Sequence, residues 1–416
     1  MQRGEAYSSM GRYPSGKRKE YPPSQAENRV PEHVGRACYT ASLMQKGFAT
    51  AEGTARYRDR FPRLREAGHF RQAPVGAGEL WMPSIGLGTY LGEPDAAADA
   101  RYAAAIAHVV RSGIHLLDTA INYRHQRSER NIGAALEQLF QAGELKRDEV
   151  VVCTKAGYLC FDGEMPPDPR QYFEREYVER GVLDPAEVAG GMHCMAPRYL
   201  ADQIERSRKN LGLETLDVFY LHNPESQFAS VDAATFRARL REAFVMLEQA
   251  VREEKLRCYG AATWSGFRVP AEAADALHLS EILDAAREAG GDQHHFRFVQ
   301  LPFNLAMPEA YAFRNQKLGA EPEPASTLTV AAAAGVVVVG SATLYQGQLT
   351  RDLPPFVRER LGTATDAESA IQFSRSAPGL ATALVGMSRA QHVDANLKVA
   401  AHAVTPLQEW KNLFVK

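Results

Sequence analysis

The chain has 416 residues, of which 45% are hydrophobic and 24% are charged, and its formal net charge is −2. This balance gives no basic excess that would favour a nucleic acid or an anionic membrane as a partner. No apolar run reaches the roughly 18 residues that a membrane-spanning helix needs, so no membrane partner is expected.

The cysteines are few and scattered, and no two of them form a Cys-x-x-Cys pair. An odd number of widely spaced cysteines argues against a disulfide framework and favours a reducing compartment. The first residues also lack the apolar stretch of a secretory signal. We therefore expect a cytoplasmic protein.

The beginning of the chain differs in composition from the rest. Residues 1–36 are polar and rich in Pro, Ser and basic residues, which predicts a disordered extension. An organelle transit peptide is the alternative, and the four glutamates in this stretch argue against it. Residues 39–67 have a weak helical pattern. We therefore divide the chain into an extension, residues 1–66, and a folded domain, residues 67–416.

The folded domain opens with two short apolar segments, residues 69–75 and 79–85. A Gly-Ala-Gly turn separates them, and this pattern predicts a β-hairpin that caps the domain.

A regular alternation of apolar runs and amphipathic stretches follows the hairpin. The runs that we interpret as strands are residues 85–90, 114–120, 149–157, 216–222, 256–263, 296–304, 335–343 and 380–388. Eight strands that alternate with helices predict a parallel sheet, and eight is the number that closes an α/β (TIM) barrel. An open, doubly wound sheet is the alternative, but residues 86–95 after the first strand lack the Gly-x-Gly-x-x-Gly phosphate loop that it would carry.

Two connections are too long to be plain loops. Residues 158–195 follow the third strand, and residues 302–327 follow the sixth. Both leave the carboxyl ends of strands, where barrels keep their active sites. Long loops in this position are commonly functional, so we expect residues 158–195 to form a lid over the substrate.

Four polar residues lie at or just after the carboxyl ends of three adjacent strands: Asp118, Tyr123, Lys155 and His222. In a closed barrel these ends converge on one mouth. Each residue alone is weak evidence, since an aspartate can cap a turn and a lysine can reach solvent. Together they form a proton-donor system, in which an ammonium lowers the pKa of a phenol and an imidazole binds the substrate oxygen. Such a site suits carbonyl reduction, for which a nicotinamide must supply the hydride.

The segments that carry these residues resemble the motifs of the aldo-keto reductase superfamily. The resemblance rests on IGLGTY, LLDTAINY, VVVCTKAGY, LDVFYLHNPE and ALVGMSRAQHVDANL, which lie between about residues 80 and 400. It implies a (β/α)8 barrel, a catalytic tetrad of Asp118, Tyr123, Lys155 and His222, and reversible reduction of aldehydes and ketones. It also implies NADP(H) as cofactor, bound without a Rossmann domain, and a small carbonyl compound as the substrate.

The resemblance places the cofactor along the other strand ends. Gln300 stands where the family holds the nicotinamide carboxamide, and Thr263 stands where the family often has Asn or Arg. The pyrophosphate stretch contains Ser341, Thr343, Leu344 and Gln348. Ser341 cannot stack on the nicotinamide as the usual flat residue would.

The segment after the eighth strand is expected to bind the adenosine phosphate. The residues assigned to it are Gly386, Ser388, Arg389, His392 and Asn396. The planar fork of Arg389 suits a 2′-phosphate, which favours NADP over NAD. The alternative for Arg389 and His392 is a solvated helix start.

Other polar and aromatic residues have weaker assignments. Asp217 and Glu225 are candidate supports for the site, with solvated roles as the alternative. Aromatic residues expected to line an apolar pocket are Tyr158, Phe161, Trp264 and Phe303. The scattered His and Cys residues lack metal-site spacing, so no metal is expected.

Two further functions stay open at this point. One is a regulatory or binding subunit that senses the nicotinamide cofactor and turns over slowly, which the departures at Ala262, Thr263 and Ser341 would allow. The other is a lyase or epimerase that uses Tyr123 and Lys155 as acid and base. The sequence gives neither the substrate nor the oligomeric state.

Overall fold

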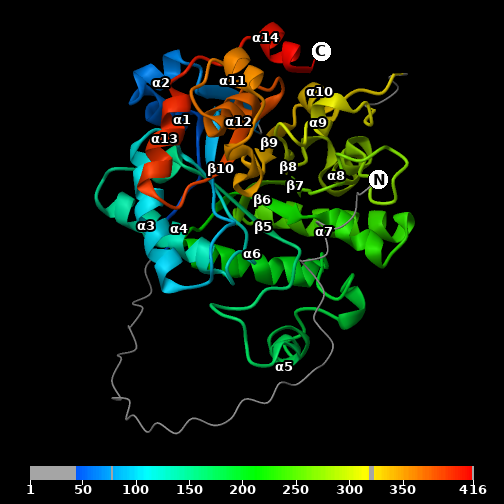
Figure 1. Cartoon of the computed structure of the whole chain (residues 1–416). Coiled ribbons are helices and arrows are strands. Elements are labelled where there is room, and N and C mark those ends of the chain that lie inside the picture. Colours follow the sequence, from blue (N-terminus) through cyan, green and yellow to red (C-terminus); the bar gives the residue numbers. More distant parts are fainter. Residues whose placement is uncertain (1–43, 76–77, 318–322, 415–416) are drawn as a thin grey trace, which may run out of the picture. The chain divides into compact units, whose positions relative to one another are not determined.

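The computed structural model describes residues 44–75, 78–317 and 323–414, and residues 1–36 of the predicted disordered extension lie outside this part. Eight parallel strands form a closed barrel in the order β10-β3-β4-β5-β6-β7-β8-β9 (Figure 1). The strands are β3 (Ile85–Gly88), β4 (Leu116–Asp118), β5 (Val151–Ala156), β6 (Leu216–His222), β7 (Leu256–Ala262), β8 (Phe296–Pro302), β9 (Val337–Ser341) and β10 (Leu380–Gly386). Each falls inside a predicted run, which confirms the barrel.

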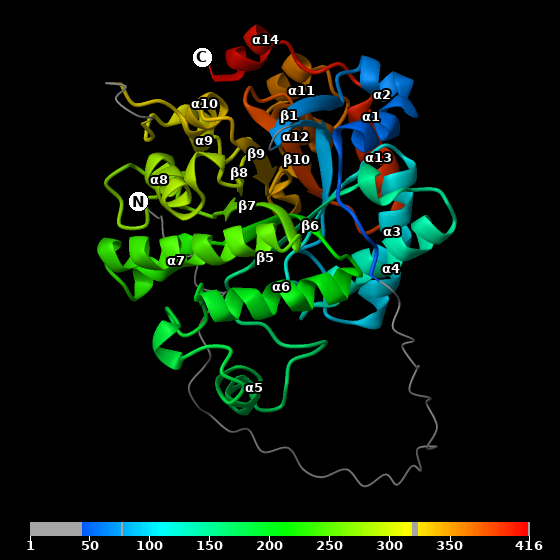
Figure 2. The same ribbon diagram turned by 180° about the vertical axis from the view of Figure 1, so that it is seen from behind.

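Helices surround the strands in both views (Figures 1 and 2). The helices of the barrel are α3 (Ala96–Arg111), α4 (Arg127–Gln141), α6 (Pro197–Leu211), α7 (Ala233–Arg252), α8 (Leu279–Gly290), α10 (Thr327–Ala333), α12 (Asp366–Arg375) and α13 (Ala390–Ala400). Shorter helices are α1 (Ala51–Asp59), α2 (Pro62–Glu66), α5 (Pro169–Phe173), α9 (Glu309–Ala312), α11 (Pro355–Leu361) and α14 (Leu407–Lys411). Within the described residues, no helix combines the length and apolar character needed to cross a membrane.

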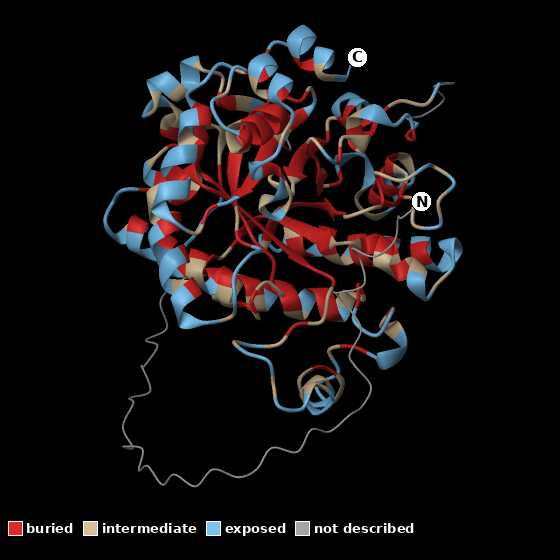
Figure 3. Cartoon of the chain, in the orientation of Figure 1, coloured by how far each residue is buried: buried red, intermediate tan, exposed pale blue. Residues whose placement is uncertain are grey.

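Local sequence explains where these helices begin and end. Asp232 caps α7 by accepting a hydrogen bond from the backbone N–H of Thr235, at 2.8 Å. Pro197 begins α6, where its missing N–H costs nothing, and Gly212 ends it in the left-handed conformation that glycine adopts freely. The buried faces of both helices pack on the strands, whereas the outer faces are exposed (Figure 3).

Alternation along the strands decides which side chains enter the barrel. On β5, Cys153 belongs to the interior cluster and Val152 belongs to the outer core, so Lys155 shares the inner face with Cys153. On β6, Val218 and Tyr220 lie in the interior cluster, which places His222 on the inner face above them. Because side chains alternate between the two faces of a strand, Lys155 and His222 point into the barrel.

The predicted hairpin is present as β1 (Phe70–Val75) and β2 (Gly78–Pro83), which pair antiparallel. Its side chains Val75, Leu80 and Met82 belong to the same buried cluster as the interior residues of the barrel strands. The hairpin therefore closes the amino end of the barrel and leaves the carboxyl end open, as expected of a cap.

Residues 44–66, which the sequence analysis placed in the extension, pack against the barrel. The backbone N–H of Ala49 donates to Asp217 Oδ1 at 2.6 Å, and the ring of Tyr57 is buried. Residues 44–66 belong to the same compact unit as the barrel. The weak helical pattern of this stretch corresponds to α1 and α2.

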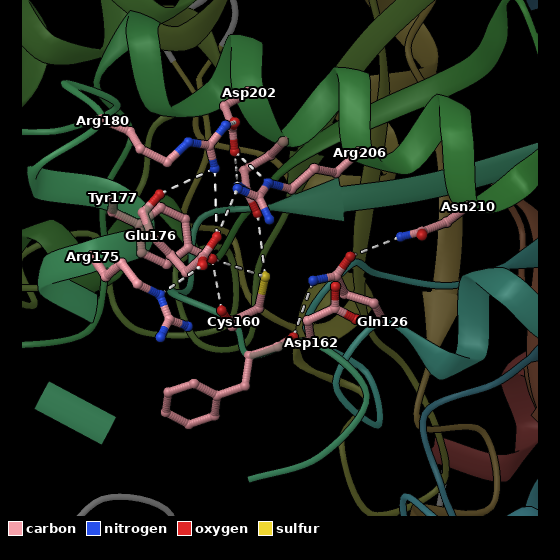
Figure 4. A network of polar contacts seen from close by, with 12 residues as sticks. Gln126, Cys160, Asp162, Arg175, Glu176, Tyr177, Arg180, Asp202, Arg206 and Asn210 are labelled. Carbon is pink, nitrogen blue, oxygen red and sulfur yellow. Dashed lines mark hydrogen bonds and ion pairs between the residues drawn. The ribbon is translucent and has the colours of Figure 1, made fainter. Parts of the chain in front are cut away.

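The long segment after β5 leads away from the barrel mouth over most of its length. Its helix α5 lies beyond α6 in both views (Figures 1 and 2). Cys160 Sγ lies 3.3 Å from Gln203 Oε1 of α6, and Glu176 pairs with Arg180 and Arg206 (Figure 4). The contacts with Arg206 and Gln203 attach the outer part of the segment to α6, whereas its role as a lid over the substrate stays a prediction.

Asp217 links several segments of the chain at the amino end of the barrel. Its carboxylate accepts from Ala49 N, from Arg147 Nη2 at 2.8 Å and from Val152 N at 2.9 Å. It lies at the opposite end of β6 from His222, so the expectation that Asp217 supports the functional site is wrong.

Replacing Asp217 by Ala should lower the free energy of unfolding by roughly 3–5 kcal/mol, because Arg147 would keep a buried charge without its partner. Urea unfolding measures this loss. Asp162→Ala removes an exposed ion pair with Arg130 and should cost less than about 1 kcal/mol. Equal losses for the two variants would contradict this account.

Candidate active site

The four residues predicted at strand ends come together at the carboxyl end of the barrel. Asp118 is the last residue of β4, His222 is the last residue of β6, and Lys155 is the second-to-last residue of β5. Tyr123 lies in the turn that follows β4. Because β4, β5 and β6 are neighbours in the barrel, their inward-facing ends converge.

A buried ion pair forms the base of the site. Lys155 Nζ lies 2.6 Å from Asp118 Oδ1 and also donates to the carbonyl oxygen of Thr119, at 2.7 Å. Gln300 Nε2 donates to the other carboxylate oxygen of Asp118, at 2.7 Å. Burial is the largest single influence on the pKa of Lys155 and lowers it, but the charge of Asp118, the nearby phenol of Tyr123 and the hydrogen bond to Asp118 together raise that pKa overall, so the ammonium stays charged.

Tyr123 lies directly over this ammonium. The Lys155 Nζ atom is 5.1 Å from the centre of the Tyr123 ring. Burial raises the pKa of Tyr123 to about 12, although the ammonium of Lys155 acts to lower it. The sequence analysis expected the ammonium to lower the pKa of the phenol. The ammonium does act in that direction, but burial outweighs it, so the expected net decrease in pKa is wrong. The phenol is therefore protonated at neutral pH.

His222 completes the group. Its ring lies edge-to-face with the Tyr123 ring, with the ring centres 5.8 Å apart. Burial, together with the nearby charge of Lys155, holds the pKa of His222 well below its ordinary value, so the imidazole is neutral. Its Nδ1 atom is buried and has no hydrogen-bond partner among the described residues. A neutral imidazole carries one N–H that can donate to a ligand oxygen.

Two further aromatic side chains flank these rings. Tyr90 lies 5.1 Å from Tyr123, and Tyr158 lies 5.2 Å from His222, both measured between ring centres. Tyr158 therefore lies beside the site, where the sequence analysis expected it, and its role as a pocket wall stays a prediction. Phe303 instead stacks in the core against Phe373, at 5.6 Å, so its expected place at the mouth is wrong.

The model of the Aldo/keto reductase family matches residues 84–413. The chain belongs to the aldo/keto reductase family. It is similar to D-threo-aldose 1-dehydrogenase from a Pseudomonas species, with 26% identity over 332 residues that cover 73% of this chain and 83% of that protein.

Solved structures of the same family share the fold. The holo form of aldo-keto reductase AKR11C1 from Bacillus halodurans has a TM-score of 0.56 and 19% identity, over 83% of this chain and 96% of that one. An aldo/keto reductase from Klebsiella pneumoniae, solved in complex with NADP and acetate, has a TM-score of 0.54 and 20% identity, over 82% and 93% of the two chains.

The residues predicted to hold the nicotinamide end lie on or just after β7, β8 and β9. Gln300 lies on β8 and is hydrogen-bonded to Asp118, so it connects β8 to the ion pair. The hydroxyl oxygens of Thr263, after β7, and Thr343, after β9, are buried and have no hydrogen-bond partner among the described residues. Ser341 is the last residue of β9 and is half-buried.

The loop after β9 has an unusual backbone. Ala342, Tyr345 and Gln346 have positive φ angles of 56°, 46° and 52°, a region that non-glycine residues rarely adopt. Strain of this kind clusters at ligand sites. Leu344 and Gln348 belong to the same turn, and Gln348 is exposed.

The residues predicted for the adenosine phosphate surround the start of α13. Gly386 ends β10, Ser388 is half-buried, and Arg389 is the N-cap residue of α13. The exposed Arg389 side chain forms no ion pair within the described part of the chain. His392 is exposed and Asn396 is buried, one helical turn later.

Several contributors to the site escaped the sequence analysis. The Thr119 carbonyl and the Tyr90 ring both touch the group, yet neither was assigned a role. The strand-end rule would have found Tyr90, which follows the first barrel strand. Glu225, a weak candidate, is buried and accepts hydrogen bonds from the backbone of Trp264 and Ser265, at 2.7 and 3.0 Å, so it shapes the loop after β7.

The ion pair makes a pH-dependent prediction. Lys155→Met leaves the Asp118 carboxylate buried without its cation. This should lower the free energy of unfolding by roughly 3–5 kcal/mol at about pH 8. Burial raises the pKa of Asp118, so at about pH 5 the carboxylate should take up a proton. The unpaired charge is then removed, and the loss of stability should be smaller. Urea unfolding at both pH values measures this difference.

The double variant Asp118→Asn/Lys155→Met is the matched control, because it has no charge to bury. It should be more stable than Lys155→Met near about pH 8 and should show little difference between the two conditions. A loss for Lys155→Met that does not change with pH would contradict the role of the carboxylate.

Proposed function

We propose that the chain is an NADPH-dependent oxidoreductase that reduces an aldehyde or ketone to an alcohol, reversibly, with Tyr123 as the proton donor. The observation that carries the proposal is the buried Lys155–Asp118 pair beneath the protonated phenol, with a neutral imidazole beside it. Family membership supports the reaction class, and the similar aldose dehydrogenase supports a small carbonyl compound as substrate.

The residues present fit a nicotinamide nucleotide. The buried hydroxyls of Thr263 and Thr343 lack partners among the described residues, and buried polar atoms normally have one, so a bound polar ligand would satisfy them. The strained turn that begins at Ala342, and Arg389, which has no ion-pair partner in the described part of the chain, extend this set along the strand ends. When bound, the nicotinamide supplies a hydride to the carbonyl carbon.

Each member of the tetrad then has one task. The Tyr123 hydroxyl transfers its proton to the carbonyl oxygen as negative charge develops there. The Lys155 ammonium stabilises the phenolate that remains, and Asp118 with the Thr119 carbonyl keeps that ammonium charged and in place. The N–H of neutral His222 is available to bind the same carbonyl oxygen.

Preference for the phosphorylated cofactor is assigned to Arg389. Its exposed guanidinium lies at the amino end of α13, where helix dipole and free N–H groups also favour an anion. The aldo/keto reductase from Klebsiella pneumoniae that was solved in complex with NADP has the same fold, and this supports NADP as the cofactor.

The central test is Tyr123→Phe. Loss of the proton donor should reduce the single-turnover rate of NADPH oxidation by roughly 10²–10⁴-fold, because the alkoxide would lack a positioned acid. Fluorescence titration should show that NADPH affinity is kept. Stopped-flow measurement with a panel of aldehydes and ketones checks the rate, and a variant as fast as the wild type would overturn the assignment.

The same measurement separates the alternatives. Tight NADPH binding by the wild type without turnover of any carbonyl would favour a cofactor-sensing subunit. Product formation without oxidation of the nucleotide would favour a lyase or epimerase.

Arg389→Ala tests the cofactor preference. Removing a charge-assisted contact to the 2′-phosphate should weaken NADPH binding roughly tenfold or more, with little change for NADH, which lacks that phosphate. Arg241→Ala, an exposed arginine on α7, is the control and should change neither affinity. Equal weakening for both nucleotides would contradict a role in discrimination.

A further inference from the structure

We infer that His193, on the returning limb of the long segment after β5, is a positioning residue that holds the backbone of His222 and thereby orients its imidazole for the substrate oxygen. The inference rests on the proposed function, because it gives His222 its partner in that reaction. It also gives the two ends of this segment a role in orienting His222, in addition to the predicted role of the segment as a lid.

The first observation is a direct hydrogen bond. His193 Nε2 lies 2.7 Å from the carbonyl oxygen of His222, and His193 is 1% exposed. The pairing between β5 and β6 ends at Ala156 and Leu221, so the His222 carbonyl lies just past that ladder. The next residue, Asn223, turns into the left-handed region with φ 49°. The imidazole therefore holds the strand at the point where it leaves the sheet.

The second observation is a space reserved for this contact. A Cβ atom added to Gly157 would lie 2.7 Å from His193 Nε2 and 2.6 Å from the His222 oxygen. Such distances are impossible for real Cβ contacts without a shift of the backbone. Glycine at position 157 therefore allows the His193 ring to reach the carbonyl.

The third observation fixes the proton on His193. Arg239 Nη1 lies 2.7 Å from Gln227 Oε1, and a guanidinium can only donate, so the amide nitrogen of Gln227 must face the other way. That nitrogen lies 2.7 Å from His193 Nδ1, which must therefore accept. The remaining proton is on Nε2, the atom that faces His222. Burial lowers the pKa of His193 to about 4, which keeps the ring neutral.

The fourth observation is that both limbs of the segment converge on His222. The limbs are joined by Leu159 N to Met192 O, at 2.8 Å, and by Cys194 N to Gly157 O, at 2.7 Å. Between them, the Tyr158 ring lies edge-to-face with both imidazoles, 5.2 Å from each. Tyr158 thus packs on the side chain of His222 while His193 holds its backbone.

A set of variants tests this arrangement. His193→Phe removes the donor but keeps a ring, and should lower the single-turnover rate roughly tenfold to a hundredfold, since small displacements of reacting groups cost that much. His193→Gln keeps an N–H donor and should recover most of the rate. Gln227→Leu leaves His193 in place but removes the donor to Nδ1, and should give an intermediate loss. NADPH affinity should stay within about twofold in all three.

His115→Phe is the matched control. His115 is also fully buried and also bonds a backbone carbonyl, that of Trp81 at 2.7 Å, but at the amino end of the barrel. This variant should lose stability as His193→Phe does and keep the wild-type rate. A loss of rate in both variants, or in neither, would overturn the inference.

Nuclear magnetic resonance of histidine-labelled, cofactor-free protein gives a readout that does not depend on turnover. His193 should appear as the neutral Nε2–H tautomer around neutral pH. The ring signals of His222 should shift in His193→Phe and stay near their wild-type positions in His193→Gln and His115→Phe. An Nδ1–H tautomer, or unshifted His222 signals in His193→Phe, would overturn the inference. Absence of turnover in the wild type would instead contradict the proposed function.

Discussion

The ion pair between Lys155 and Asp118 is the constraint on which the site depends. An ammonium can be buried only beside an opposite charge, and here the two groups come from neighbouring strands and meet at 2.6 Å. The pair also receives Gln300 from the far side of the barrel, so one carboxylate connects β4, β5 and β8. A charge held in this way is fixed in position, and the phenol of Tyr123 lies over it. The proposed proton-donor chemistry therefore depends on a contact that also links three strands of the barrel.

The two ends of the barrel perform separate tasks. The amino end is filled by the hairpin and by residues 44–66, with Asp217 accepting hydrogen bonds from three parts of the chain. The carboxyl end contains the four residues of the candidate site, the hydroxyls of Thr263 and Thr343, which have no hydrogen-bond partner among the residues described, and the strained loop after β9. This division is the one that barrels of this kind usually follow, with stability concentrated at one face and chemistry at the other. Strand β6 shows it within its seven residues, with Asp217 near its start and His222 at its end.

The long segment after β5 joins the site to the outside of the barrel. Its outer part is attached to α6 by ion pairs such as Glu176–Arg206 (Figure 4) and by the Cys160–Gln203 contact, and its two ends reach His222. At those ends, Tyr158 and His193 surround His222. These contacts suit the support of His222 that we infer for the ends of the segment.

The sequence by itself determined the barrel, the hairpin and the four residues at the strand ends. It could do so because strand alternation has a fixed period of two and because parallel strands place their carboxyl ends together. Tertiary structure decided what depends on distance in space. Burial raises the pKa of Tyr123, whereas the charge of Lys155 alone would lower it. The spacing of residues along the sequence does not show how deeply a side chain is buried. The core position of Phe303 and the contact of His193 with His222 likewise arise from irregular segments, whose paths follow no period and are set by packing.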